Sequence, residues 1–141
     1  MPKSIDARCR EEVVDLHRFF EGWFRGAVES TDENFSQLER SLGAQFTLIS
    51  PDGRTSERAS LVAGLRSAHG SHQSDDSDFR IWIENVTVRP LSAELILVTY
   101  EEWQELEGST TARLSTAVLQ SRTGRTGQFE WLHVHETWLS R

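Results

Sequence analysis

The chain has 141 residues, a formal net charge of -7 at pH 7 and 37% hydrophobic residues. This length is typical of a single domain, which we expect to span residues 1–141. The acidic balance argues against a nucleic-acid or anionic-membrane partner. Cys9 is the only cysteine, which excludes an internal disulfide framework. Without a long apolar run or a signal peptide pattern, the sequence predicts a cytoplasmic protein.

The first half of the chain predicts three helices and a short hairpin. The first helix is amphipathic, because Val13, Leu16, Phe20 and Phe24 recur at helical spacing. Capping residues and glycines mark the ends of the other two helices, and the Ser-Pro-Asp-Gly turn marks the hairpin. The expected ranges are 5–29, 31–43 and 56–70 for the helices and 45–55 for the hairpin.

From residue 79 onward the sequence has the pattern of strands. Aromatic and β-branched residues dominate four runs, which short polar turns separate. Such an arrangement predicts an antiparallel meander with strands at residues 79–89, 93–106, 111–122 and 129–139. Helices followed by a meander belong to the α+β class, with the helices and the hairpin packed on a curved four-stranded sheet.

The order of these elements resembles the nuclear transport factor two-like superfamily, whose cystatin-like α+β cone also serves ketosteroid isomerases and SnoaL-like cyclases. The resemblance is carried by the aromatic segment 17–24, the turn 50–53, the segment 112–115 and the closing residues 131–135. It implies a sheet that wraps the long helix and leaves an internal pocket. It also implies a homodimer formed through the outer face of the sheet.

The last two strands are most similar to the association domain of the calcium/calmodulin-dependent kinases. By that similarity Arg113, Trp131 and His135 line the pocket, and Thr137 stands where the pattern has a second histidine. The catalytic set of the isomerases cannot be carried over, because the first helix has no tyrosine and no aspartate follows Asp78. The resemblance therefore implies a fold and a pocket rather than a reaction.

The closing strand carries the candidate acid–base groups. Its side chains alternate over residues 130–138, which places Trp131, His133, His135 and Thr137 on one face. Imidazoles titrate near neutral pH, so His133 and His135 are the candidate catalytic residues. Trp131 and Thr137 are candidate ligand contacts beside them.

A metal site is the alternative interpretation of this histidine pair. Side chains two residues apart on a strand project to the same side and could hold a metal with a third ligand from His17 or Glu101. A lone His-x-His pair more often consists of hydrogen-bonded imidazoles in a pocket or core. The sequence therefore predicts neither a metal nor another cofactor.

Arg113 and Ser115 lie on a strand of mostly small and apolar residues. Arg113 is either exposed at the sheet edge or buried. If it is buried, it pairs with Glu101 or Glu102 or holds an anionic ligand, because an unpaired buried charge is too costly. On the neighbouring strand, alternation places Glu101 on one face and Tyr100 and Glu102 on the other. One of the two glutamates then faces the concave side, unless the end of the strand projects beyond the helices and leaves both in solvent. Glu101 is a candidate catalytic base, and Tyr100 is a candidate donor to an enolate oxygen.

Phe20, Trp23 and Phe24 of the first helix, with Trp131, would floor the pocket, although aromatic residues at helical spacing more often form plain core. His17 is a further candidate ligand contact. The leading functional hypothesis is a small-molecule-binding protein whose pocket favours an anionic or carbonyl ligand. The alternative is an isomerase, dehydratase or cyclase that uses pocket histidines, and the sequence leaves open whether the protein is an enzyme. A further alternative is a dimeric assembly module without a ligand, based on apolar residues of the outer sheet face such as Leu132 and Trp138.

Overall fold

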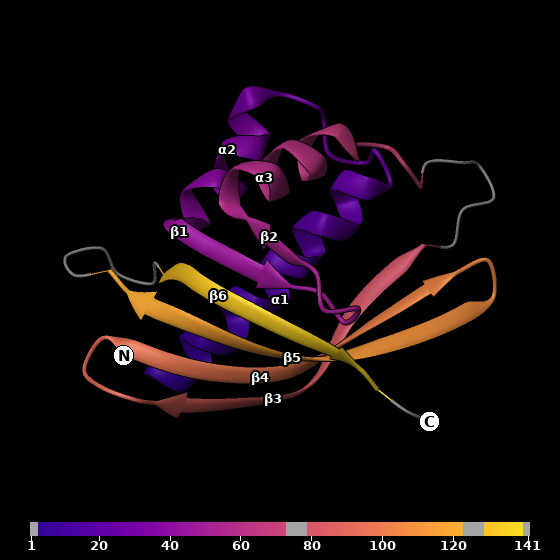
Figure 1. Ribbon diagram of the computed structural model, residues 1–141. Coiled ribbons are helices and arrows are strands. Elements are labelled where there is room, and N and C mark those ends of the chain that lie inside the picture. Colours follow the sequence, from indigo (N-terminus) through magenta and orange to yellow (C-terminus); the bar gives the residue numbers. More distant parts are fainter. Residues whose placement is uncertain (1–2, 73–78, 123–128, 140–141) are drawn as a thin grey trace.

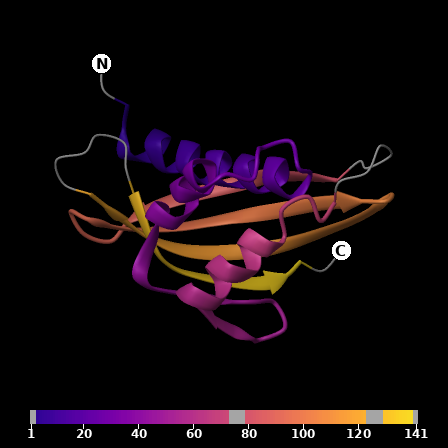
Figure 2. The ribbon, with the colours of Figure 1, turned by 90° about the horizontal axis from the view of Figure 1, so that it is seen from above.

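In the part of the chain that the structure describes, the helices lie on one face of a curved sheet (Figure 1). The computed structural model describes residues 3–72, 79–122 and 129–139. Seen from above, the helices cover the concave face of the sheet (Figure 2). Within the described ranges, no helix is both long and apolar enough to cross a membrane.

The helices precede most of the sheet along the chain. They are α1 (Ile5–Phe24), α2 (Asp32–Ser41) and α3 (Arg58–Ser67). The strands are β1 (Leu42–Ile49), β2 (Thr55–Glu57), β3 (Arg80–Pro90), β4 (Leu95–Leu106), β5 (Ser109–Ser121) and β6 (Phe129–Trp138). Each predicted helix and strand therefore corresponds to an observed one.

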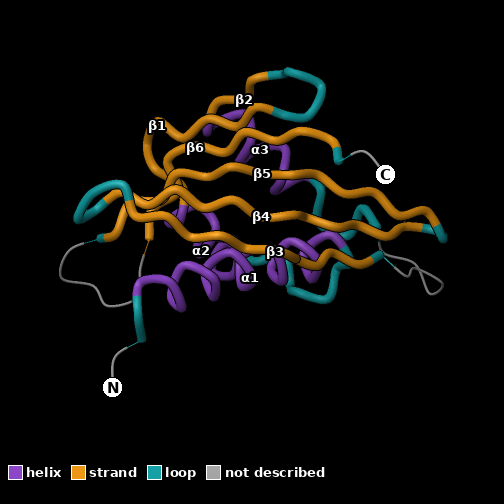
Figure 3. Tube along the Cα trace, turned by 90° about the horizontal axis from the view of Figure 1, so that it is seen from below, coloured by secondary structure: helices purple, strands orange, loops and turns teal. Residues whose placement is uncertain are grey.

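The described strands form one sheet in the order β2-β1-β6-β5-β4-β3 (Figure 3). Strands β3 to β6 form the predicted antiparallel meander. β1 pairs with β6 in parallel, and β2 pairs with β1 in antiparallel. The α+β prediction is confirmed, but the sheet has six strands instead of four, because the hairpin extends it beyond β6.

The long helix α1 packs across β3 and supplies much of the core. Ser4 caps its start, since the Ser4 hydroxyl accepts a hydrogen bond of 3.1 Å from the backbone N–H of Ala7. The helix ends at Phe24 instead of residue 29, because Gly26 adopts a left-handed backbone with φ of 75°. The buried residues of its inner face are Cys9, Val13, His17 and Trp23.

Strand β4 shows how alternation brings a carboxylate into the core. Every second side chain points to the concave face, and the buried ones are Ile96, Val98, Tyr100 and Glu102. The row is apolar until its last members, where Glu102 is only 8% exposed. A buried carboxylate needs partners, so the elements packed against Glu102 must supply them.

A β-bulge in β6 determines which face each of its side chains occupies. Val118 pairs with His133, but the next residue of β5, Leu119, pairs with Trp131. Leu132 is therefore an extra residue without a partner on β5, and it breaks the strict alternation of the strand. Trp131 lies in the core cluster with 1% exposure, whereas His133 is partly exposed.

The bulge corrects the predicted face of the closing strand. His133 and His135 pair with Val118 and Thr116, which point away from the helices, so both histidines lie on the convex face. Trp131 and Glu136 are instead buried on the concave face. The prediction that Trp131 and the two histidines share a face is wrong, because the sequence pattern does not reveal the extra residue.

Candidate functional site

The concave face and the three helices enclose a cavity of about 200 Å³. Most of its lining is apolar and comes from all three helices and from β1, β3 and β6. One wall is polar, because β4, β5 and β6 each present charged or amide side chains to it. The polar lining residues are His17, Tyr100, Glu102, Gln104, Arg113 and Glu136.

His17 joins α1 to this polar wall. Its side chain is buried, and its ring nitrogens lie 2.8 Å from the carbonyl oxygen of Val13 and 3.1 Å from Oε1 of Glu102. Burial by itself lowers the pKa of His17, but the charge and the hydrogen bond of Glu102 outweigh burial, and the pKa is raised. His17 therefore favours the protonated form beside the carboxylate.

Glu102 is the acceptor at the centre of the wall. Its second oxygen, Oε2, accepts a hydrogen bond of 2.6 Å from the side-chain amide of Gln104. Burial by itself raises the pKa of Glu102. The opposing effect of His17 and Arg113 is larger, and the pKa is lowered to about 2. The carboxylate is therefore charged at neutral pH and fully paired. Between the two glutamates of this strand, Glu102 faces the cavity.

Arg113 points into the cavity, and its partner is Glu136. Their shortest N–O distance is 3.3 Å, and the ring centroid of Trp138 lies 4.8 Å from the guanidinium carbon. Burial raises the pKa of Glu136, while Arg113 opposes that shift. Of the two positions that the sequence left open for Arg113, the structure shows the inward one, but its ion-pair partner is neither Glu101 nor Glu102. Sequence reasoning missed Glu136 because it placed the histidines of β6 on the inner face.

Tyr100 and Ser115 face each other on neighbouring strands, deep in the same wall. Both are almost completely buried, and the Tyr100 ring lies 5.3 Å from the ring of His17. Burial raises the pKa of Tyr100 well above its ordinary value, and Glu102 adds to the effect. Tyr100 therefore stays protonated across the physiological range.

Other predicted site residues lie elsewhere. Glu101 points to the convex face, where it accepts hydrogen bonds from Asn85 and Trp103. His133 is 2.7 Å from the hydroxyl of Thr47 on the same face, and Thr137 is exposed there too. Trp138, predicted on the outer face, instead stacks over Arg113.

The structure thus brings together only part of the predicted site. His17, Phe20, Tyr100, Arg113 and Trp131 line the cavity, and Ser115 is enclosed beside it. Trp23 is buried under α3, where its indole donates a hydrogen bond to the carbonyl of Leu65. The predicted catalytic and ligand-binding roles of these residues stay predictions. Among the described residues, no group of three or more histidine, cysteine or carboxylate side chains is placed to hold a metal.

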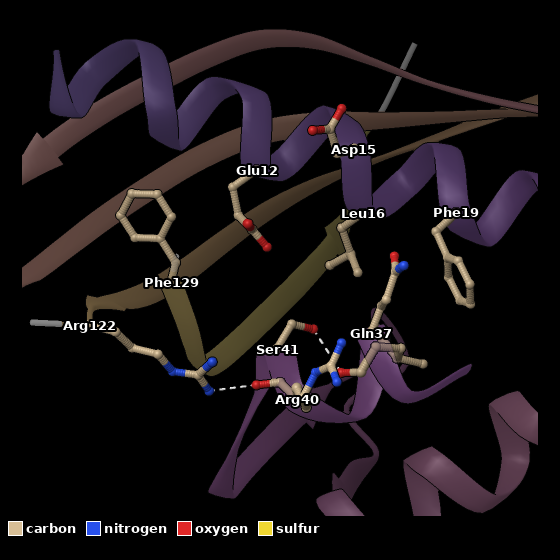
Figure 4. Close-up of a pocket in the computed structure, with 10 residues that line it drawn as sticks. Glu12, Asp15, Leu16, Phe19, Gln37, Arg40, Ser41, Arg122 and Phe129 are labelled. Carbon is tan, nitrogen blue, oxygen red and sulfur yellow. Dashed lines mark hydrogen bonds between the residues drawn. The ribbon is translucent and has the colours of Figure 1, made fainter. Parts of the chain in front are cut away.

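A second and larger pocket of about 520 Å³ lies outside the core, and we name it the outer groove. It runs between α1 and α2 and reaches the adjoining ends of β5 and β6 (Figure 4). Ten residues line it: Glu12, Asp15, Leu16, Phe19, Gln37, Leu38, Arg40, Ser41, Arg122 and Phe129. None of them was a predicted site residue.

The groove could be found only partly from the sequence. Glu12, Asp15, Leu16 and Phe19 follow helical spacing, so the sequence places them on one face of α1. That face mixes acidic and apolar side chains, which is unusual for a core-facing stripe. The opposite wall comes from α2, and only the packing of the two helices shows that it faces Glu12.

Contacts hold both walls of the groove in place. Trp131 donates a hydrogen bond of 2.8 Å from its indole nitrogen to Oε2 of Glu12. Burial raises the pKa of Glu12, and the Trp131 hydrogen bond opposes the shift. Arg122 donates to the backbone carbonyl of Arg40 and lies 3.2 Å from Glu130. The loop end of β5 is thereby tied to the end of α2.

Comparison with known proteins identifies the family. Residues 9–140 match the family model described as sucrose-6-phosphate phosphohydrolase C-terminal. The chain is 30% identical over 129 residues to sucrose-phosphatase 1 of Nicotiana tabacum and 32% identical over 131 residues to sucrose-phosphatase 2 of the same plant. These matches cover 91% and 92% of this chain but only 30% of each relative.

Solved structures confirm the predicted nuclear transport factor two-like fold. An NTF2-like protein of unknown function from Pseudomonas aeruginosa superimposes with a TM-score of 0.81 at 23% identity, over 94% of this chain and 99% of that one. The CaMKII hub of S. rosetta superimposes with a TM-score of 0.69 at 11% identity, over 99% and 100% of the two chains. At these identities the similarity concerns the fold alone.

The family match corrects the functional prediction. The prediction of a binding protein of uncharacterised role, selective for an anionic or carbonyl ligand, is wrong, because the relatives are sucrose-phosphatases. The chain is therefore related to a family of enzymes that are phosphatases. The predicted isomerase, dehydratase or cyclase type is not confirmed.

Proposed function

Because the chain belongs to the sucrose-6-phosphate phosphohydrolase C-terminal family, we propose that it acts as one non-catalytic domain working with a sucrose-phosphate-hydrolysing phosphatase domain. The observation that carries the proposal is the extent of the match. Nearly the whole chain aligns with relatives named sucrose-phosphatase, yet the chain spans only 30% of their length. Hydrolysis in such a pair belongs to the other domain.

The inner cavity supports a non-catalytic role. Glu102 is held by His17 and Gln104, and Arg113 by Glu136. A group that attacks or protonates a phosphate ester must be available to the substrate. These side chains are instead committed to one another. The His17–Glu102 pair holds α1 on the concave face, and the Arg113–Glu136 pair joins β5 to β6.

The partner domain and a second copy of the chain need surfaces to bind, and the convex face of the sheet suits self-association. No described helix covers this face (Figure 3). Leu114 is 39% exposed there, and the indoles of Trp82 and Trp103 stack at 6.0 Å. Exposed apolar and aromatic side chains among polar ones are typical of an interface between protomers. The proposed assembly is a homodimer formed through the convex face.

Phosphate release from sucrose 6-phosphate tests the proposed function. Tobacco sucrose-phosphatase 1 without its matching segment is assayed alone, with an equimolar amount of this chain, and with heat-denatured chain as the control. We expect the chain alone to release no phosphate and to raise the rate or the thermal half-life of the truncated phosphatase. Phosphate release by the chain alone, or no effect of the native chain, would overturn the proposal.

A further inference from the structure

The outer groove differs from the inner cavity in whether its polar side chains have partners within the protein. The charged groups of the inner wall are paired with one another, whereas the groove presents polar groups with no protein partner in the described part of the chain. These are the side-chain amide of Gln37 and the guanidinium of Arg40, both on the exposed side of α2. Groups that can donate and accept hydrogen bonds are thus available to a ligand.

Glu12 supplies an oriented acceptor on the opposite wall. Trp131 holds Oε2 of Glu12 at 2.8 Å, which leaves the other oxygen for the groove. Figure 4 shows the Glu12 carboxylate directed into the space between the α1 and α2 side chains. An acceptor whose rotamer is already fixed loses little entropy when it binds a hydroxyl group.

Phe19 and Leu16 add an apolar surface beside these polar groups. The Phe19 ring is half-buried and stacks on Trp23 with centroids 5.6 Å apart, so contact with Trp23 helps to fix the position of the ring. In Figure 4 Phe19 lies at the opposite end of the groove from Phe129. The volume of about 520 Å³ falls within the range of roughly 300–1,000 Å³ of small-molecule sites.

This combination defines the ligand class. A sugar offers many hydroxyl groups, which both donate and accept, and apolar C–H faces that pack on an aromatic ring. We propose that the outer groove binds a disaccharide of the sucrose type, with Glu12 and Gln37 contacting hydroxyl groups and Phe19 contacting a sugar face. This inference rests on the proposed function, from which the sugar class follows.

The charges of the groove indicate how a phosphorylated sugar would be oriented. Glu12 and Asp15 lie on the α1 wall and disfavour a phosphate there through like-charge repulsion. Arg40 on the α2 wall is the cation without a partner in the described residues, and guanidinium groups bind phosphate well. The phosphate of sucrose 6-phosphate would therefore lie against Arg40, while inorganic phosphate alone would bind weakly.

Calorimetric titration of the full chain with sucrose, sucrose 6-phosphate and inorganic phosphate tests the inference. We expect both sugars to bind, and Gln37→Ala to weaken both by about tenfold, the effect of one lost hydrogen bond in a confined site. Arg40→Met should weaken sucrose 6-phosphate and leave sucrose unchanged. Arg89→Met, which changes an exposed arginine of β3 outside the groove, is the control and should bind like the wild type.

Gln37 and Arg40 are exposed, so their variants keep the fold, which circular dichroism verifies. Binding of neither sugar, or unchanged binding in Gln37→Ala, would overturn the sugar site. Inorganic phosphate binding as tightly as sucrose 6-phosphate would show a phosphate site instead. If the chain still activates the truncated phosphatase while these titrations fail, the proposed function stands and the sugar site alone is wrong. Loss of that activation in Gln37→Ala without sugar binding would show a docking groove for the phosphatase domain.

Discussion

Nε2 of His17 on α1 lies 3.1 Å from Oε1 of Glu102 on β4, and both side chains are at most 10% exposed. The pair is a buried polar connection between the long helix and the concave face. Because both charges are removed from water, each depends on the other for compensation. This relationship determines how the stability of the protein responds to substitution and to pH.

Glu102→Gln should lower the free energy of unfolding by about 3 kcal/mol, the usual cost of breaking a buried ion pair by removing one partner. Urea denaturation followed by tryptophan fluorescence measures this. Glu101→Gln is the matched control, because the neighbouring glutamate lies on the convex face and should cost no more than about 1 kcal/mol. Equal losses in the two variants would show that Glu102 is not the partner of His17.

The stability should depend on pH through both members of the pair. The folded-state pKa of His17 is raised from 6.5, so its contribution is complete below that pH and is lost as the pH rises through the raised pKa. The pKa of Glu102 is lowered from 4.5 to about 2, so its contribution is complete above 4.5 and is lost as the pH falls toward 2. The pair therefore contributes most between these limits.

Urea denaturation across pH 5 to 9 isolates the histidine contribution. The difference in unfolding free energy between the wild type and His17→Gln should shrink as the pH rises through the folded-state pKa of His17. His135→Gln is the control, because His135 is exposed on the convex face, on the opposite side of the sheet from Glu102. A difference that stays constant with pH would mean that His17 is neutral in the folded protein.

Arg113→Met should destabilise the protein more at pH 7 than at pH 4. Without Arg113, the buried carboxylate of Glu136 loses its cation, and its already raised pKa rises further. A carboxyl group with a raised folded-state pKa makes the folded protein less stable as the pH rises. The loss of unfolding free energy in Arg113→Met should therefore approach about 3 kcal/mol at pH 7. Arg54→Met, in the exposed hairpin turn, is the control, and equal costs at both pH values would contradict the pairing.

A charge on the convex face should separate the proposed homodimer. Leu114→Glu buries a carboxylate in the expected interface, and a buried unpaired charge costs several kcal/mol. Light scattering after size exclusion should then show the mass of one 16.1 kDa chain instead of two. Leu91→Glu is the control, because Leu91 is 52% exposed in a turn outside the sheet. A monomeric wild type, or a dimeric Leu114→Glu variant, would exclude this interface.

The positions of only some residues of the inner polar wall could be predicted from the sequence. Strand alternation predicts that Tyr100 and Glu102 share a face, but it does not say which face is the inner one. The pocket position of Arg113 was implied by the family resemblance. His17 was predicted at the cavity from its place beside the apolar stripe of α1. Glu136 was missed, since one extra residue in β6 reverses the faces that alternation assigns, and nothing in a single sequence marks that bulge.

Local chemistry was enough to determine the α+β class, the early helices and the meander, because hydrophobic period and turn residues are properties of short segments. The structure alone decided that Glu102 meets His17, that the β6 histidines lie on the convex face, and that α1 and α2 form the outer groove. Each of these depends on residues far apart in the chain, and the register and helix packing that join them are determined by the whole fold.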